Sequence, residues 1–159
     1  GRPYSYTWRR YSLFDYDDNI LAYIPEAGDP NVVYSGVSEA AVLDHINKLG
    51  LSGYAGSIVP RNVGNADYFR SLDMRIAQEI PGFMDDDKFT IYFDAVNILN
   101  FFNDSEGLRY YKGSTQEILE TDGLDAQGRW IITGTRDESS FIDFNSSSYR
   151  FQLGFSYEF

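Results

Sequence analysis

Alternating polarity is strongest at the end of the chain, in residues 149–159, with the sequence YRFQLGFSYEF. Every second position is apolar or aromatic, namely Tyr149, Phe151, Leu153, Phe155, Tyr157 and Phe159, and Arg150, Gln152, Gly154, Ser156 and Glu158 lie between them. Because alternate residues of a strand point to opposite faces, the pattern predicts a strand with one apolar and one polar face. Its length matches the roughly 9–11 residues with which a tilted strand crosses a bilayer. A half-buried strand of a soluble sheet is the alternative, although such strands average about 5–6 residues.

Two further segments predict a hairpin. In residues 69–80, one face carries Leu72, Met74, Ile76, Gln78 and Ile80, and the other carries Ser71, Asp73, Arg75, Ala77 and Glu79. In residues 88–97, Phe89, Ile91, Phe93 and Ala95 alternate with Thr90, Tyr92, Asp94 and Val96. Pro81 and Gly82 end the first strand, and the acidic residues 85–87 complete a short turn. Short turns of this kind lie on the periplasmic side of outer-membrane barrels.

The remaining segments are less regular. We predict shorter strands at residues 4–9, 108–112 and 129–135, turns at 121–128, loops at 15–35 and 98–107, and either a strand or a helix at 116–120. The spacing of Val42, Leu43, Ile46 and Leu49 predicts a helix over residues 37–49. Ser38 is its expected N-cap, and Gly50 is expected to end it.

Composition narrows the class of protein. Aromatic residues make up 17% of the chain, mostly Tyr and Phe, which favour strands and form the aromatic girdles of membrane barrels. The absence of cysteine excludes disulfides and thiolate metal sites. The net charge of −11 argues against nucleic acid as a partner. No apolar run is long enough to predict a transmembrane helix. The chain starts at Gly1 without a signal peptide, so we expect a piece of a longer protein.

Residues 70–104 resemble the penultimate hairpin of TonB-dependent outer-membrane receptors. The matching residues are Leu72, Asp73 and Arg75 of an LD-x-R pattern, and Asp94, Asn97 and Asn100 of a D-x-x-N-x-x-N pattern. Residues 149–159 resemble the last strand of that family, which ends in Phe. The opening GRPYSYTW and residues 60–62 further resemble the Oar-like subgroup, whereas residues 108–148 match only loosely.

This resemblance implies that residues 1–159 form the C-terminal part of an all-β, antiparallel transmembrane barrel of about 22 strands in a Gram-negative outer membrane. The helix at 37–49 would lie in an extracellular loop. The family's plug and TonB box are not in this sequence, and about five or six strands cannot close a barrel, so the chain would pair with the remainder of its own barrel and plug. The other implied partners are the TonB complex, outer-membrane lipid and the barrel assembly machinery, which would read the terminal aromatic strand.

The two faces of these strands then have different surroundings. The polar residues expected to face the lumen or the plug are Asp73, Arg75, Asp94, Arg150, Gln152 and Glu158. An arginine on the lipid face would instead cost about 2–4 kcal/mol at the bilayer midplane.

The sequence predicts no catalytic site and no cofactor. His45 is the single histidine and lies beside Asp44. One histidine without a cysteine nucleophile does not support a catalytic triad, so we expect a surface loop residue. The pair Asp17 and Asp18 is likewise expected to be solvated rather than an acid–base couple.

Metal binding has one candidate motif. Residues 15–26 place Asp15, Asp17, Asn19 and Glu26 at the spacing of an EF-hand loop. However, Ile20 stands where the turn requires glycine, and Pro25 would block the following helix, so we predict a polar loop and no metal site. The same expectation holds for residues 85–87.

The leading hypothesis is a receptor that imports an extracellular ligand through a plugged barrel, without covalent chemistry, so that the protein is not an enzyme. The sequence leaves the ligand open among siderophores, cobalamins, oligosaccharides and peptides, and the Oar-like resemblance favours larger polymeric or peptide cargo. The acidic, Tyr-rich residues 15–35 are the expected ligand-facing loop. The alternatives are a soluble extracellular β-sandwich module that binds carbohydrate or protein, and a structural surface barrel without a transport cycle.

Overall fold

The computed structural model describes residues 1–10, 20–84 and 87–159, and the chain divides into two compact units. Unit 1 comprises residues 1–66 and 112–140, and unit 2 comprises residues 67–111 and 141–159. Strands dominate the described residues and three short α-helices accompany them, which confirms the all-β expectation. The division into two units was not predicted.

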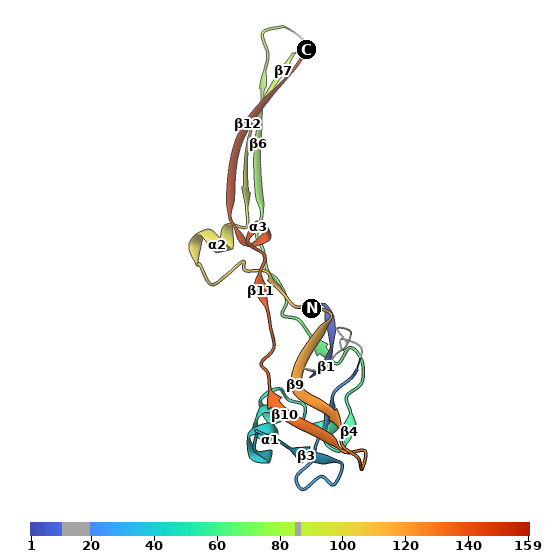
Figure 1. The fold of residues 1–159 in the computed structure, drawn as a ribbon. Coiled ribbons are helices and arrows are strands. Elements are labelled where there is room, and N and C mark those ends of the chain that lie inside the picture. Colours follow the sequence, from blue (N-terminus) through green and yellow to red (C-terminus); the bar gives the residue numbers. More distant parts are fainter. Residues whose placement is uncertain (11–19, 85–86) are drawn as a thin grey trace. The chain divides into compact units, whose positions relative to one another are not determined.

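Unit 1 is built on a five-stranded sheet (Figure 1). Its strands lie in the order β3 (Val32–Tyr34), β10 (Trp130–Thr135), β9 (Thr115–Leu124), β1 (Pro3–Arg10) and β5 (Gly64–Asn65). The strands β2 (Tyr23–Ile24) and β4 (Ser57–Ile58) form a separate antiparallel pair. Antiparallel strands were predicted throughout, but two pairs of strands are parallel, namely β1 with β9 and β10 with β3. These partners are far apart in the chain and are not joined by hairpins, so the connection does not force them to be antiparallel.

The core of unit 1 surrounds β1. Tyr4, Tyr6 and Trp8 alternate along this strand as predicted, and Ser5 and Thr7 between them are also buried. The strand is therefore covered on both faces. The Trp8 ring stacks on Trp130 with centroids 4.9 Å apart. The other buried apolar residues of this core are Ala22, Ile24, Val32, Val42, Ile46, Leu51, Val59, Ile118, Leu119 and Ile132.

The predicted helix is present as α1 (Glu39–Lys48). Ser38 caps it as expected, because its hydroxyl oxygen accepts a hydrogen bond from the Ala41 amide at 3.2 Å. Such a cap contributes about 1 kcal/mol. Gly50 follows with φ +72°, in the left-handed region that glycine adopts readily at helix ends. A 3-10 turn, η2 (Ser52–Tyr54), completes this segment.

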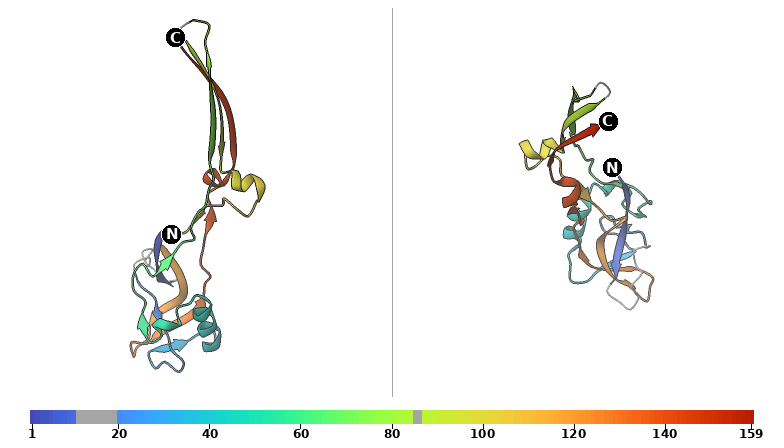
Figure 2. Two further views of the ribbon diagram at one scale, coloured as in Figure 1. Left: turned by 180° about the vertical axis from the view of Figure 1, so that it is seen from behind. Right: turned by 90° about the horizontal axis from the view of Figure 1, so that it is seen from above.

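Unit 2 contains a three-stranded antiparallel sheet. Its strands β6 (Met74–Pro81), β7 (Lys88–Val96) and β12 (Arg150–Glu158) run side by side in the order β12-β7-β6 (Figures 1 and 2). The hairpin of β6 and β7 confirms the sequence prediction, although β6 begins later than expected. The pair β8 (Tyr110–Tyr111) and β11 (Phe141–Ile142) and the helices α2 (Ile98–Phe102) and α3 (Phe144–Ser147) complete the unit. No helix among the described residues is long and apolar enough to cross a membrane.

Three segments differ from the sequence prediction. Residues 98–102 form α2 instead of irregular structure. β9 continues to Leu124, into the predicted turn, because Gly123 adopts a positive φ and the pairing shifts register beside Ile131. The predicted loop 15–35 contains β2 and β3 in its described part, whereas residues 15–19 lie outside the described residues.

Candidate functional site

The long sheet of unit 2 has one apolar face, which its register defines. Ile76 of β6 lies opposite Phe93 of β7, and Phe93 lies opposite Leu153 of β12. The face comprises Met74, Ile76, Gln78 and Ile80 of β6, Phe89, Ile91, Phe93 and Ala95 of β7, and Phe151, Leu153, Phe155 and Tyr157 of β12. Leu153 and Phe155 are each 75% exposed, so no other described part of unit 2 packs over them. The structure therefore presents a broad apolar surface of a size that folded soluble units rarely leave uncovered.

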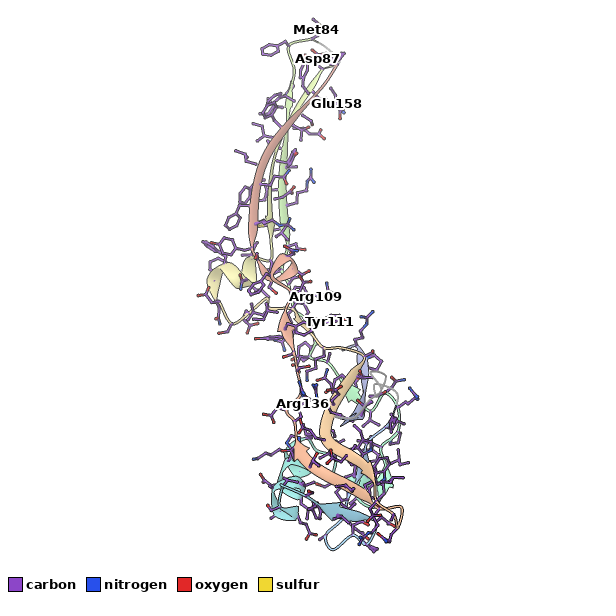
Figure 3. All side chains as sticks on the ribbon, in the orientation of Figure 1. Met84, Asp87, Arg109, Tyr111, Arg136 and Glu158 are labelled. Atoms are coloured by element: carbon purple, nitrogen blue, oxygen red, sulfur yellow. The ribbon has the colours of Figure 1, made fainter. Side chains whose placement is uncertain are left out.

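Large apolar side chains are also exposed at one end of this sheet. At the 82–87 turn, Phe83 and the terminal Phe159 are each 99% exposed. Figure 3 shows Met84 and Asp87 at this end, near Glu158, and Arg109 and Tyr111 toward the opposite end of unit 2. The Tyr157 hydroxyl donates a hydrogen bond to Asp87 there. β6 and β7 are joined by six residues, whereas β7 and β12 are joined by a much longer stretch of chain, so the two ends of the sheet differ.

The opposite face is polar and contains an open pocket of about 490 Å³. Five of the six residues predicted to face a lumen line it, namely Asp73, Arg75, Asp94, Arg150 and Gln152. The sixth, Glu158, lies at the far end of β12 opposite Lys88. These five side chains line one pocket, and their two arginines and two aspartates balance in charge.

Arg75 is the centre of the contacts on this face. Its Nε lies 3.5 Å from Oδ1 of Asp94, the residue directly across the β6–β7 pair. Its guanidinium carbon lies 4.6 Å from the centre of the Tyr92 ring. Tyr92 in turn covers Gly154 of β12, where a Cβ would lie only 2.3 Å from the ring. Arginine, tyrosine and glycine on three neighbouring strands therefore fit together in one layer.

The residues that carried the family resemblance meet at the end of this sheet. The Asn97 amide donates to Oδ1 of Asp73 at 2.8 Å, and the Ile98 amide donates to the Leu72 carbonyl at 2.8 Å. The Asn100 amide donates to the Asn97 carbonyl at 3.1 Å, and its side chain donates to the carbonyl of Glu106 at 3.0 Å. The two patterns, whose linked residues Asp73 and Asn97 are 24 positions apart in the chain, thus form one junction between the start of β6 and the end of β7.

Asn97 extends this junction to the third strand. Its buried side-chain amide donates to the carbonyl of Gly107 and to the carbonyl of Ser147, both at 2.9 Å. Ser147 ends α3, shortly before β12. Asn97 has φ +53°, a left-handed conformation that asparagine tolerates better than most residues. Through its backbone and its side chain together, Asn97 therefore links the end of β7 to the segments that precede β6 and β12.

Unit 1 contains a half-buried charge cluster that the sequence analysis missed. Glu138 accepts hydrogen bonds from the hydroxyls of Tyr4 at 2.6 Å and Tyr6 at 2.9 Å, and forms an ion pair with Lys112 at 2.7 Å. Burial alone would raise the pKa of Glu138, but the hydrogen bonds from Lys112, Tyr4 and Tyr6 lower it below its ordinary value. Burial raises the pKa of Tyr6, and the bonds to Tyr4 and Glu138 add to this. The cluster therefore favours an ionised Glu138 beside neutral tyrosines.

Two other groups in unit 1 have structural roles. His45 was predicted to lie at the surface of a loop, but it is buried on α1, with Nδ1 3.8 Å from Asp137. The prediction was wrong because the helix turns this position toward the core together with Val42 and Ile46. Burial would raise the pKa of Asp29, but hydrogen bonds from the Tyr23 hydroxyl and from backbone amides lower it.

The described residues contain no group of three or more potential ligands that could hold a metal ion. Most of the EF-hand-like motif, at Asp15, Asp17 and Asn19, lies outside the described residues, as do Asp17–Asp18 and Asp85–Asp86. Comparisons of this chain with protein-family models, with curated proteins and with solved structures find no match. The two faces of the long sheet are therefore the features from which a function can be argued.

Proposed function

We propose that the sheet of β6, β7 and β12 forms part of the wall of a transmembrane β-barrel in a Gram-negative outer membrane. The uncovered apolar face carries this proposal, because the polar face directly behind it holds the Arg75–Asp94 pair. A wall between lipid and an aqueous lumen requires this combination of faces. The register supports it, since it keeps the exposed Leu, Ile, Met and Phe side chains of the three strands on the same side, while Ala77, Tyr92 and Val96 lie on the other.

The edges of the sheet support the same proposal. β6 and β12 are the outer strands, and within the described residues no further strand pairs with their free edges. Long apolar strands with unpaired backbone groups aggregate in water and are not stable in hydrocarbon. We therefore propose that strands of the remainder of the barrel pair with both edges, and that the plug contacts the polar face of the sheet from within the lumen.

The dimensions also agree. A strand rises about 3.3 Å per residue, so residues 149–159 extend for about 33 Å. At the usual tilt of about 35–45° this spans about 25 Å along the membrane normal, which is the height of the apolar band of outer-membrane barrels. Tyr149 and Phe159 would then lie at the two boundaries of the band.

We further propose that the whole protein is a TonB-dependent receptor, which rests on the resemblance of residues 70–104 and 149–159 to that family. The short 82–87 turn would lie in the periplasm, and the long connections at the other end would lie outside the cell. Unit 1 belongs to those connections, so it would be the part that meets an extracellular ligand. Import would be driven by the TonB complex and involve no covalent step.

A soluble β-sandwich module is the competing proposal. A sandwich needs a second sheet packed about 10 Å from the apolar face of the first. The high exposure of Leu153 and Phe155 argues against such a covering sheet among the described residues of unit 2.

Fractionation of the source cells tests the proposal. The native protein should stay in the outer-membrane fraction after carbonate washing, and its mobility on SDS gels should change on boiling. Its intact mass should be several times the 18.2 kDa of this chain. A freely soluble protein of about this mass would overturn the proposal.

A further inference from the structure

We infer that α2 lies in the interface between lipid headgroups and acyl chains, and that Phe102 inserts into the bilayer there. This inference rests on the proposed membrane position of the sheet and assigns a lipid contact to a segment outside the strands. Its partner is the bilayer itself rather than another protein.

The position of α2 on the apolar side of the sheet follows from ring contacts. The Phe101 ring lies 5.2 Å from the ring of Phe151, at an interplanar angle of 80°. It lies at the same distance from the ring of Tyr149, at an angle of 74°. Phe151 belongs to the apolar face, so the helix packs over the end of that face and not over the polar one. The side of α2 that carries Phe101 therefore lies against the apolar face of the sheet.

Phe102 is the more exposed of the two phenylalanines of α2. Phe102 is 78% exposed, and among the described residues the only ring it contacts is Phe101, at 5.3 Å. An isolated exposed phenylalanine is ordinary, but this one continues an apolar surface that already extends along three strands. Because Phe102 continues that surface, the lipid proposed to cover the sheet would also cover Phe102.

The chain changes polarity at this point. The five residues of α2, ILNFF, are followed by Asn103, Asp104, Ser105 and Glu106, all of which are exposed. A segment that is apolar on the sheet side and acidic immediately beyond fits the boundary between acyl chains and headgroups. Asn97 precedes the helix and donates hydrogen bonds to Gly107 and Ser147 at 2.9 Å, which holds the start of α2 close to the segment that leads into β12.

Nitroxide labels on the intact protein in phospholipid vesicles test the inference. Labels are placed singly by Phe102→Cys, by Leu153→Cys as a mid-bilayer reference and by Glu106→Cys as an aqueous reference on the same connection. This chain contributes no cysteine of its own. The measured quantity is the ratio of collisions with oxygen, which concentrates in lipid, to collisions with a water-soluble nickel chelate. All three positions are exposed, so the label fits without disturbing a core, and heat-dependent gel mobility confirms assembly.

We expect the ratio at residue 102 to be several-fold higher than at residue 106 and lower than at residue 153. If residue 153 contacts lipid but residue 102 matches residue 106, the inference fails while the proposed membrane sheet survives. If residue 153 is itself aqueous or inaccessible to both reagents, the proposed function fails, and the inference fails with it.

Discussion

Replacement of Glu138 by glutamine is the most informative test of unit 1. In the native protein this carboxylate accepts bonds from Tyr4 and Tyr6 and pairs with Lys112, and the side chains of Glu138 and Lys112 are only 20% and 14% exposed. Glu138→Gln keeps the shape but removes the charge. The Lys112 ammonium then remains half-buried without its counter-charge, and the tyrosine hydroxyls lose a charged acceptor.

The expected cost follows from these contacts. Hydrogen bonds to charged groups contribute about 1.5–3 kcal/mol when they are lost, and glutamine can still accept one of them. Because the cluster retains some contact with water, we expect a loss of about 2 kcal/mol in the stability of unit 1. Since about 1.4 kcal/mol corresponds to a tenfold change in an equilibrium constant, the opening equilibrium should increase about 30-fold.

Hydrogen exchange measured by mass spectrometry on the intact protein detects this opening. Amides of β1 and β9 should exchange about 30-fold faster in Glu138→Gln, because local opening limits their exchange. The matched control is Asp44→Asn, which removes a 2.7 Å ion pair with Lys48 between side chains that are 60% and 71% exposed. The control should leave these amides unchanged. Equal effects of the two substitutions, or no effect of Glu138→Gln, would refute the reasoning.

Four further outcomes are expected. The pKa of Glu138 is lower in the folded protein than its ordinary value of 4.5. The stability that ionised Glu138 contributes is therefore fully present above pH 4.5 and is lost as the pH falls through the folded pKa. The hydrogen exchange of wild type and Glu138→Gln should accordingly converge in acid. Leu153→Arg should cost about 2–4 kcal/mol and reduce the heat-modifiable fraction, whereas Ser156→Arg on the polar face should assemble normally. Gly154→Val should displace the Tyr92 ring and lower the free energy of unfolding, measured with urea in micelles, by about 1–3 kcal/mol. If the effects of Gly154→Val and Tyr92→Ala were additive in the double variant, the two residues would not be in contact. Asn97→Ala should lower the free energy of unfolding in the same assay by about 2–3 kcal/mol, because the hydrogen bonds are lost and the backbone is strained at a positive φ. Asn97→Gly should relieve the strain but not restore the hydrogen bonds.

The long strands could be predicted because their signal is local. The alternation in residues 149–159 needs no knowledge of partners, and it located β12 within one residue at each end. The same period placed Arg75 and Asp94 on one face, where the structure pairs them across neighbouring strands. A two-residue period therefore predicted the three long strands of unit 2.

The parts that were missed depend on contacts between distant segments. Lys112 and Glu138 are 26 residues apart, and their tyrosine partners lie more than 100 residues away in β1. No spacing rule brings these residues together, nor does one predict the parallel pairing of β1 with β9. The alternation of Tyr4, Tyr6 and Trp8 was visible, but it did not indicate that both faces of that strand are covered.

His45 and Asn97 illustrate two different failures. His45 was assigned to the surface because it is polar, although its spacing from Val42 and Leu49 placed it near the apolar side of α1. Asn97 was recognised as part of a pattern, but its role as a junction required the positions of Gly107 and Ser147, which only the folded chain provides.

The central claim is that the odd-numbered residues of β12 face lipid and the even-numbered residues do not. The most direct measurement places a fluorescent bimane label singly at residues 150, 151, 152, 153, 155 and 156 of the intact protein and compares its emission in brominated and unbrominated phospholipid. We expect strong quenching at residues 151, 153 and 155 and little at residues 150, 152 and 156. Absence of quenching at all positions, or the reverse alternation, would contradict the account.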